Sequence, residues 1–130
     1  MDEVSGAAML VRRDTFEQVG LLDEGFFYWE DIDWCKRIKA AGWKVVYLPR
    51  AKVVHHHFGG SSGEVRPLTH LASLRSTHYY FRKHHGALTA LLVKTTLVLR
   101  EAVHLLLAAI TLRRERLRLR LNSLRGALNP

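Results

Sequence analysis

The sequence predicts an α/β protein made of two parts, a compact α/β unit over residues 1–64 and a basic, Leu-rich helical region over residues 65–130. Short apolar runs alternate with amphipathic and turn-forming segments in the first part, which is typical of α/β units. Longer segments of helix-compatible composition fill the second part. The charge also divides the chain, because the first part carries a net charge of −2 and the second a net charge of +10.

Three apolar runs predict β-strands in the first part. The run GAAMLV at residues 6–11 is short and built of small and apolar side chains. The runs WKVVYL at residues 43–48 and AKVVHHH at residues 51–57 are rich in β-branched residues and are separated by Pro49. These strands alone are too few to close an independent sheet.

Two helices are expected between the first two strands. Asp14, followed three residues later by Glu17, predicts a capping box at the start of a short helix that ends at Gly20. The acids of EDID at residues 30–33 favour the first turn of a second helix, where the helix dipole stabilises negative charge. Gly42 is expected to end this second helix.

The second part predicts helices over residues 68–85, 87–112 and 113–125, with a break at Gly86. Charged residues interrupt residues 87–112, whose longest apolar run is far shorter than the ~20 residues of a membrane span. Its polar positions are not confined to one face in this pattern, so a buried helix and a membrane-apposed helix both stay open.

The last segment, RRERLRLRLNSLR, is strongly basic and has leucines at helical spacing. It is either a solvated cationic helix that packs one leucine stripe, or a basic amphipathic helix on an anionic membrane surface. The segment does not favour nucleic-acid binding, because no aromatic residues that could stack on bases are interleaved with the arginines.

The composition excludes several classes of protein. A chain of 130 residues that is 48% hydrophobic is not a disordered polar tail. The single cysteine, Cys35, excludes an internal disulfide and a Cys-based zinc site, and suits a reducing compartment. The first ten residues carry acids where a signal peptide has basic residues, so no signal peptide is expected.

The candidate chemistry of the first part lies in acids and histidines. Glu30, Asp31 and Asp33 follow four consecutive aromatic residues at positions 26–29. A carboxylate close to like charges and aromatic surface can serve as a general base. The alternative is that these acids only start a helix and face water.

A run of three histidines, residues 55–57, lies at the end of the last predicted strand. In an extended chain His55 and His57 point to one face and His56 to the other. Two imidazoles on one face could share a divalent metal, although the run lacks the carboxylates that Mg²⁺ or Mn²⁺ prefers. An exposed histidine run is the alternative.

Five segments occur in an order that resembles the C-terminal half of the catalytic domain of family 2 glycosyltransferases, in particular the bacterial rhamnosyltransferase-like branch. They are the GAAML strand, the VGLLDEGFF approach, the EDIDWCKR helix start, the GWKVVYLP strand and the His-x-x-x-Gly-Gly-Ser ending, within residues 5–63. The resemblance implies a partial GT-A (nucleotide-diphospho-sugar transferase-like) fold. It also implies an inverting transfer from a nucleotide-sugar donor to a polysaccharide or lipid-linked acceptor, in the synthesis of cell-surface polysaccharide.

The resemblance assigns roles to residues at the acceptor side. Asp31 is implied to be the general base that deprotonates the acceptor hydroxyl, and Glu30 to bind the acceptor or support Asp31. Trp29 and Tyr28 are implied to form the wall that faces the sugar or the acceptor.

Three further residues match the family's pattern. Asp33 and Arg37 occupy motif positions that are implied to support the substrate-binding helix and loop. His55 aligns with a histidine that joins Mg²⁺ or Mn²⁺ on the donor diphosphate, and the neighbouring His56 and His57 leave this register open. The metal would stabilise charge on the leaving diphosphate.

The family's N-terminal half, with its nucleotide-binding strands and Asp-x-Asp metal motif, has no counterpart in this sequence. A divalent cation would therefore require that missing half. The sequence predicts a truncated glycosyltransferase that is inactive by itself, in the cytoplasm or peripheral on the inner face of the plasma membrane. The alternative is a non-catalytic fragment that binds a membrane surface or a separate nucleotide-binding N-terminal half.

Overall fold

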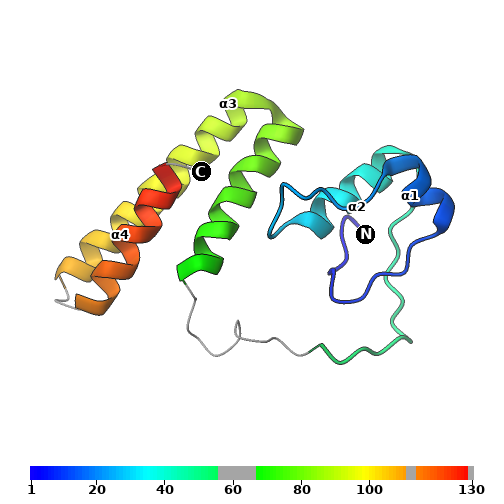
Figure 1. The fold of residues 1–130 in the computed structure, drawn as a ribbon, viewed down its shortest axis with the longest axis horizontal. Helices are drawn as coiled ribbons and strands as arrows, with labels where there is room; N and C mark the ends of the chain where they lie inside the picture. The colour runs from blue at the N-terminus through cyan, green and yellow to red at the C-terminus, as the bar shows by residue number, and fades with distance from the viewer. Residues whose placement is uncertain (56–66, 111–113, 129–130) are drawn as a thin grey trace. The chain divides into compact units, whose positions relative to one another are not determined.

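A computed structural model describes residues 1–55, 67–110 and 114–128, and places four helices in this part of the chain (Figure 1). The first unit, Met1–Phe58, contains α1 (Arg13–Val19) and α2 (Glu30–Ala40). The second unit, Gly59–Pro130, contains α3 (Pro67–Ile110) and α4 (Arg114–Leu128). Helix α1 contacts α2, and α3 contacts α4, so each unit has its own packed helices.

No β-strand occurs within the described residues, so the predicted α/β class with a partial GT-A fold is wrong for this structure. Residues 6–11, 43–48 and 51–55 form turns and irregular coil instead. β-favouring side chains produce a strand only where a neighbouring strand completes the hydrogen-bond ladder, and these segments have no such neighbour here. Residues 56 and 57 of the last predicted strand lie outside the described residues.

Helix α1 is short and begins without the predicted capping box. Arg12 occupies the N-cap position, and no side chain caps the helix. The Asp14 carboxylate pairs with Arg12 at 3.4 Å and does not accept a backbone N–H at the helix start, which the prediction required. The predicted end is confirmed, because Gly20 follows the helix with a φ of 78° and its N–H binds the Phe16 carbonyl at 2.8 Å.

Helix α2 has its three acids in the first turn, as predicted, and Gly42 follows its end with a φ of 88°. Its inner face buries Asp33, Cys35 and Ile38. Burial raises the pKa of the Cys35 thiol, which therefore behaves as a small core residue and not as a nucleophile.

Helix α3 folds back on itself at Gly86, which confirms the predicted break (Figure 1). Gly86 has φ 82° and ψ 173°, a region that only glycine enters readily. The turn creates two helical arms, residues 67–85 and residues 87–110. Helix α4 runs alongside them and completes a small three-helix arrangement within this unit.

The interior of the second unit is built mainly of small side chains. Among the residues whose burial is described, the buried ones are Leu74, Ser76, Tyr80, Ala90, Glu101, Ala108, Ser123 and Ala127. Gly126 of α4 lies so close to Leu71 of α3 that an added Cβ would overlap the leucine Cδ2. Small residues let the helix backbones approach, but they bury little apolar surface.

Candidate functional site

The first turn of α2 begins in an unusual backbone conformation. Trp29, at the N-cap position, has a left-handed φ of 76°, and no other residue except glycine has a positive φ in the described chain. Its carbonyl accepts the Asp33 N–H at 2.9 Å. Left-handed backbone is costly for a bulky residue, and such strain is concentrated at functional sites. The conformation directs the chain sharply from the aromatic segment into the acidic turn.

The Asp31 carboxylate is held by backbone N–H groups. Its Oδ2 accepts the Gly6 N–H at 2.7 Å, and its Oδ1 accepts the N–H of Ile32 at 2.8 Å. A Cβ added at Gly6 would lie 3.4 Å from the Asp31 side chain, which is ordinary van der Waals contact. The half-buried carboxylate is therefore fixed in orientation by a segment 25 residues away in sequence.

Glu30 has one carboxylate oxygen, Oε2, that is buried without a hydrogen-bond partner within the described structure. A buried acceptor without a partner costs about 1–3 kcal/mol. This oxygen belongs to the residue before Asp31 in the sequence, and it has an unused capacity to accept a hydrogen bond. The sequence indicated the acidic pair, but it could not indicate which oxygen lacks a partner.

The aromatic segment before α2 leaves part of its ring surface exposed. Tyr28 packs edge-on against Phe27, with ring centroids 5.2 Å apart at an interplanar angle of 80°. Tyr28 is 40% exposed and Phe27 is 67% exposed, while Trp29 is half-buried and Phe26 is buried. An exposed aromatic face beside carboxylates can pack against the C–H face of a sugar while the acids bind its hydroxyls.

Asp33 and Arg37 join α2 to the end of α1. Asp33 is fully buried, and its Oδ2 accepts the Arg37 Nε–H at 2.8 Å. The same guanidinium donates to the carbonyls of Val19 and Leu21, at 2.5 and 2.7 Å. Both side chains thus engage groups of their own unit, and they hold the loop that leads from α1 into the aromatic segment.

His55, the predicted metal ligand, is exposed. The described residues contain no group of three or more His, Cys, Asp or Glu side chains that could hold a metal ion. His56 and His57, the alternatives for this ligand, lie outside the described residues. The described part of the structure therefore does not assemble a metal site at His55.

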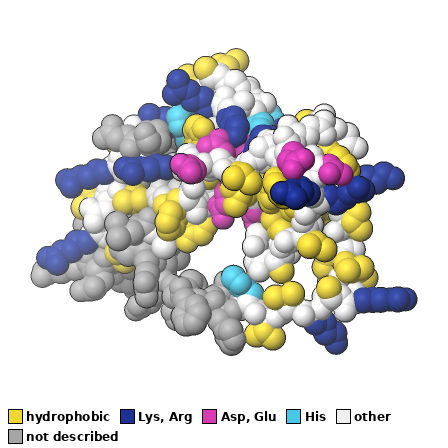
Figure 2. Space-filling model, turned by 45° about the vertical axis from the view of Figure 1, so that its right-hand side comes forward, with side chains coloured by type: hydrophobic (Ala, Val, Ile, Leu, Met, Phe, Trp, Pro, Cys, Tyr) yellow, Lys and Arg dark blue, Asp and Glu magenta, His cyan; other side chains and the backbone are white. Residues whose placement is uncertain are grey.

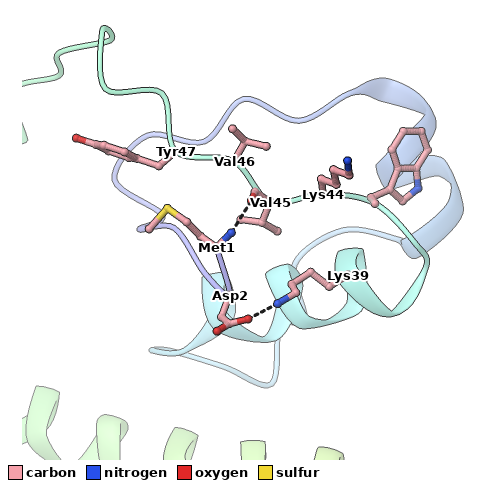
Figure 3. Close-up of a pocket in the computed structure, with 8 residues that line it drawn as sticks. Met1, Asp2, Lys39, Lys44, Val45, Val46 and Tyr47 are labelled. Carbon is pink, nitrogen blue, oxygen red and sulfur yellow. Dashed lines mark hydrogen bonds and ion pairs between the residues drawn. The ribbon is translucent and has the colours of Figure 1, made fainter.

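A cavity of about 630 Å³ lies elsewhere in the first unit (Figure 3). The Met1 ammonium donates to the Val45 carbonyl at 3.0 Å, and Asp2 pairs with Lys39 (Figure 3). The hydrogen bond from Lys39 lowers the pKa of Asp2. The cavity is lined by Met1, Asp2, Lys39, Trp43, Lys44, Val45, Val46 and Tyr47, and none of these is a predicted site residue.

Residues 1–85 match a protein family described as "Glycosyltransferase like family 2". The chain is 43% identical over 79 residues to an N-acetylglucosaminyl-diphospho-decaprenol L-rhamnosyltransferase of Mycobacterium tuberculosis, covering 60% of this chain and 25% of the relative. It is 42% identical over 60 residues to the rhamnosyltransferase WbbL of Escherichia coli, covering 44% of this chain and 23% of the relative. The chain thus spans about a quarter of the length of these curated relatives. No solved structure matches it significantly.

Proposed function

This chain belongs to the glycosyltransferase-like family 2, and on that premise we propose that residues 28–37 are the acceptor side of an inverting sugar transfer. The donor is a nucleotide-activated sugar, and the acceptor is a hydroxyl of a polysaccharide or of a lipid-linked glycan. The names of two relatives favour rhamnose as the transferred sugar. The reaction is a step in the synthesis of cell-surface polysaccharide.

Asp31 acts as the general base in this proposal. Its carboxylate takes the proton of the acceptor hydroxyl while the hydroxyl oxygen attacks the anomeric carbon of the donor. A new C–O bond forms on one face of the sugar as the bond to the nucleoside diphosphate breaks on the other. The anomeric configuration inverts, and the diphosphate leaves with the bonding electron pair.

The observation that carries the proposal is the fixed orientation of Asp31. The Gly6 N–H binds its Oδ2 at 2.7 Å, so the carboxylate is held before any acceptor arrives. A base that is already oriented loses less entropy when the reacting groups come together. The unpartnered oxygen of Glu30 offers a neighbouring acceptor for a second hydroxyl, and the rings of Tyr28 and Trp29 supply the apolar wall.

A divalent cation on the donor diphosphate would need the carboxylates of an Asp-x-Asp motif. This sequence contains such a motif only at residues 31–33, which belong to the acceptor-side helix. The described residues around His55 form no ligand set that fits such a cation. No step of the proposed reaction is therefore assigned to it.

A segment exchange tests the proposal directly. The 79 residues of the Mycobacterium tuberculosis relative that match this chain are replaced by the matching residues of this chain, and rhamnosyl transfer is measured. In the active chimera, Asp31→Asn is expected to lower the turnover rate at least about a hundredfold, because the proton acceptor is lost. Asparagine keeps one oxygen that accepts the Gly6 N–H, but its amide nitrogen cannot accept the Ile32 N–H, so circular dichroism of the purified chimera checks that the fold is retained.

Asp14→Asn is the matched control, because Asp14 is an exposed carboxylate of the same unit that pairs with the exposed Arg12. This variant is expected to keep the turnover rate of the chimera. Full activity of the Asp31→Asn chimera would contradict the assignment of the base. A folded but inactive unmutated chimera would favour the non-catalytic, partner-binding alternative.

A further inference from the structure

The second arm of α3, residues 87–110, carries a continuous apolar stripe that is exposed along its length. The stripe repeats every three to four residues and spans about 33 Å and about 160° of the helix circumference. Its members are Leu88, Leu91, Leu92, Leu99, Val103, Leu106, Leu107 and Ile110, each between 53% and 77% exposed, together with the exposed Thr95 and Thr96.

Polar groups are absent from the stripe or are satisfied within the helix. The hydroxyl of Thr95 donates to the Leu91 carbonyl at 2.9 Å, and that of Thr96 donates to the Leu92 carbonyl at 3.0 Å. The charged and histidine side chains of this arm lie at other angles around the helix; they are Lys94, Arg100, Glu101 and His104. The charged positions and His104 therefore lie on the face opposite the stripe, which corrects the interpretation that the polar positions of this segment are not confined to one face.

The second unit is also inverted relative to an ordinary water-soluble helical bundle. Apart from Leu74 and Tyr80, its buried side chains are alanines, serines and the charged Glu101, while most of the leucines whose exposure is described face outward. Small residues between helices and large apolar residues on the outside are typical of helices that contact lipid. None of the described helices is long and apolar enough to cross a bilayer.

The exposed charge of this unit is almost entirely positive. Residues 65–130 carry a net charge of +10, and Glu101 is buried among cationic side chains. Lys and Arg side chains project from the surface in Figure 2. The cations of this unit whose exposure is described are Arg75, Arg82, Lys83, Lys94, Arg100, Arg118, Arg120 and Arg125.

We propose that the stripe of residues 88–110 docks on the surface of an anionic lipid bilayer, with the helix lying in the plane of the interface. The leucines enter the boundary between headgroups and acyl chains, and the surrounding Lys and Arg side chains bind the anionic headgroups. Two copies would bring together two segments that each carry +10 over residues 65–130, so the charge disfavours a second copy as the occupant. This contact does not depend on the sugar transfer proposed above.

Vesicle flotation of the full 130-residue chain tests the proposal. The chain is expected to float with vesicles of phosphatidylglycerol and phosphatidylcholine in equal parts, and not with vesicles of phosphatidylcholine alone. The double variant Leu92→Gln/Leu106→Gln is expected to lower the partition coefficient at least about tenfold, because two apolar side chains no longer enter the interface. Both leucines are more than 60% exposed, so their replacement leaves the packed interior unchanged.

The matched control replaces two exposed leucines of the first unit, Leu21→Gln/Leu22→Gln, and is expected to bind vesicles as the unmodified chain does. A fluorophore sensitive to its surroundings gives a second measurement. Cys35 is 0% exposed, so a cysteine introduced by Leu99→Cys is labelled selectively. Its emission is expected to shift to the blue on addition of anionic vesicles, and that of a label at Leu22→Cys is not.

Three results would overturn the proposal. The first is equal binding to neutral and anionic vesicles, or binding to neither. The second is unchanged flotation of the double stripe variant, which would mean that the chain is adsorbed by charge alone. The third is a combination of two observations: sedimentation shows a dimer that the double stripe variant abolishes, and vesicles leave the emission of the label at position 99 unchanged. A second copy of the chain would then be the occupant.

Discussion

Arg120 of α4 donates to the buried carboxylate of Glu101 in α3, with 3.2 Å between Nη1 and Oε2. Arg100 binds the other oxygen at 2.9 Å, and His70 of the first arm lies 3.3 Å from the same oxygen. One carboxylate thus links both arms of α3 to α4. Burial by itself would raise the pKa of Glu101, but the hydrogen bonds from Arg100 and Arg120 outweigh it and lower the pKa.

Removing this charge is expected to weaken the second unit. Glu101→Gln keeps the shape of the side chain but leaves Arg100 and Arg120 without a buried anion, and it should lower the free energy of unfolding by about 2–3 kcal/mol. Urea unfolding followed by helical circular dichroism measures the change. Glu17→Gln, which removes an exposed carboxylate paired with Arg13, is expected to leave stability nearly unchanged. Equal stability of both variants would contradict the linking role of Glu101.

The stability of the second unit is expected to fall in two steps on acidification. Burial, aided by the charges of Lys94 and Arg82, lowers the pKa of His78, so stability decreases as pH drops through the ordinary histidine pKa of about 6.5. The lowered pKa of Glu101 stabilises the fold above about pH 4.3, and this contribution is lost as pH falls through its folded value.

Urea titrations between pH 7 and pH 3 separate the two steps. Glu101→Gln is expected to retain the histidine step and to lose most of the lower one, because the glutamine does not titrate. A lower step of unchanged size in this variant would assign the acid sensitivity to other carboxylates.

The sequence predicted the helical elements better than the strands because helices satisfy their hydrogen bonds locally. Gly20, Gly42 and Gly86 all take positive φ angles at positions where the sequence predicted an end or a break. The segments at residues 6–11 and 43–48 have strand-like composition but no neighbouring strand, and a ladder cannot form without one. Composition alone carries no information on whether such a neighbour is present.

The contacts of the candidate site were only partly predictable. The acidic turn and its aromatic neighbours could be predicted, because they are consecutive in the sequence and the resemblance to the family assigns them a role. The bond from Gly6 to Asp31 and that from Arg37 to the Val19 carbonyl join residues 25 and 18 positions apart. No periodic pattern marks such contacts, although the small side chain at position 6 is consistent with a close approach.

Gly86→Ala tests the turn between the arms of α3. No atom lies within 4 Å of an added Cβ, so the cost comes from the backbone conformation alone and should be about 1–3 kcal/mol. A continuous helix over residues 67–110 would relieve this strain by opening the arms, which small-angle scattering would detect as a larger radius of gyration. Ala87→Gly, at the next helical position, is expected to leave the radius unchanged. An unchanged radius and stability of Gly86→Ala would show that the turn tolerates a side chain.

Arg37→Lys tests whether the planar guanidinium is needed to hold the first unit together. Arg37 binds Asp33 and two carbonyls at once, whereas a lysine ammonium is a compact charge that cannot match this fork. The variant is expected to lower the stability of the first unit by about 1–3 kcal/mol, because buried Asp33 and the carbonyls lose donors. Fluorescence reports the change, since all three tryptophans lie in this unit. Arg13→Lys is the matched control, because Arg13 forms an exposed pair with Glu17, and this variant should unfold as the unmodified chain does. If Arg37→Lys also unfolds as the unmodified chain does, the link between α1 and α2 depends on other contacts.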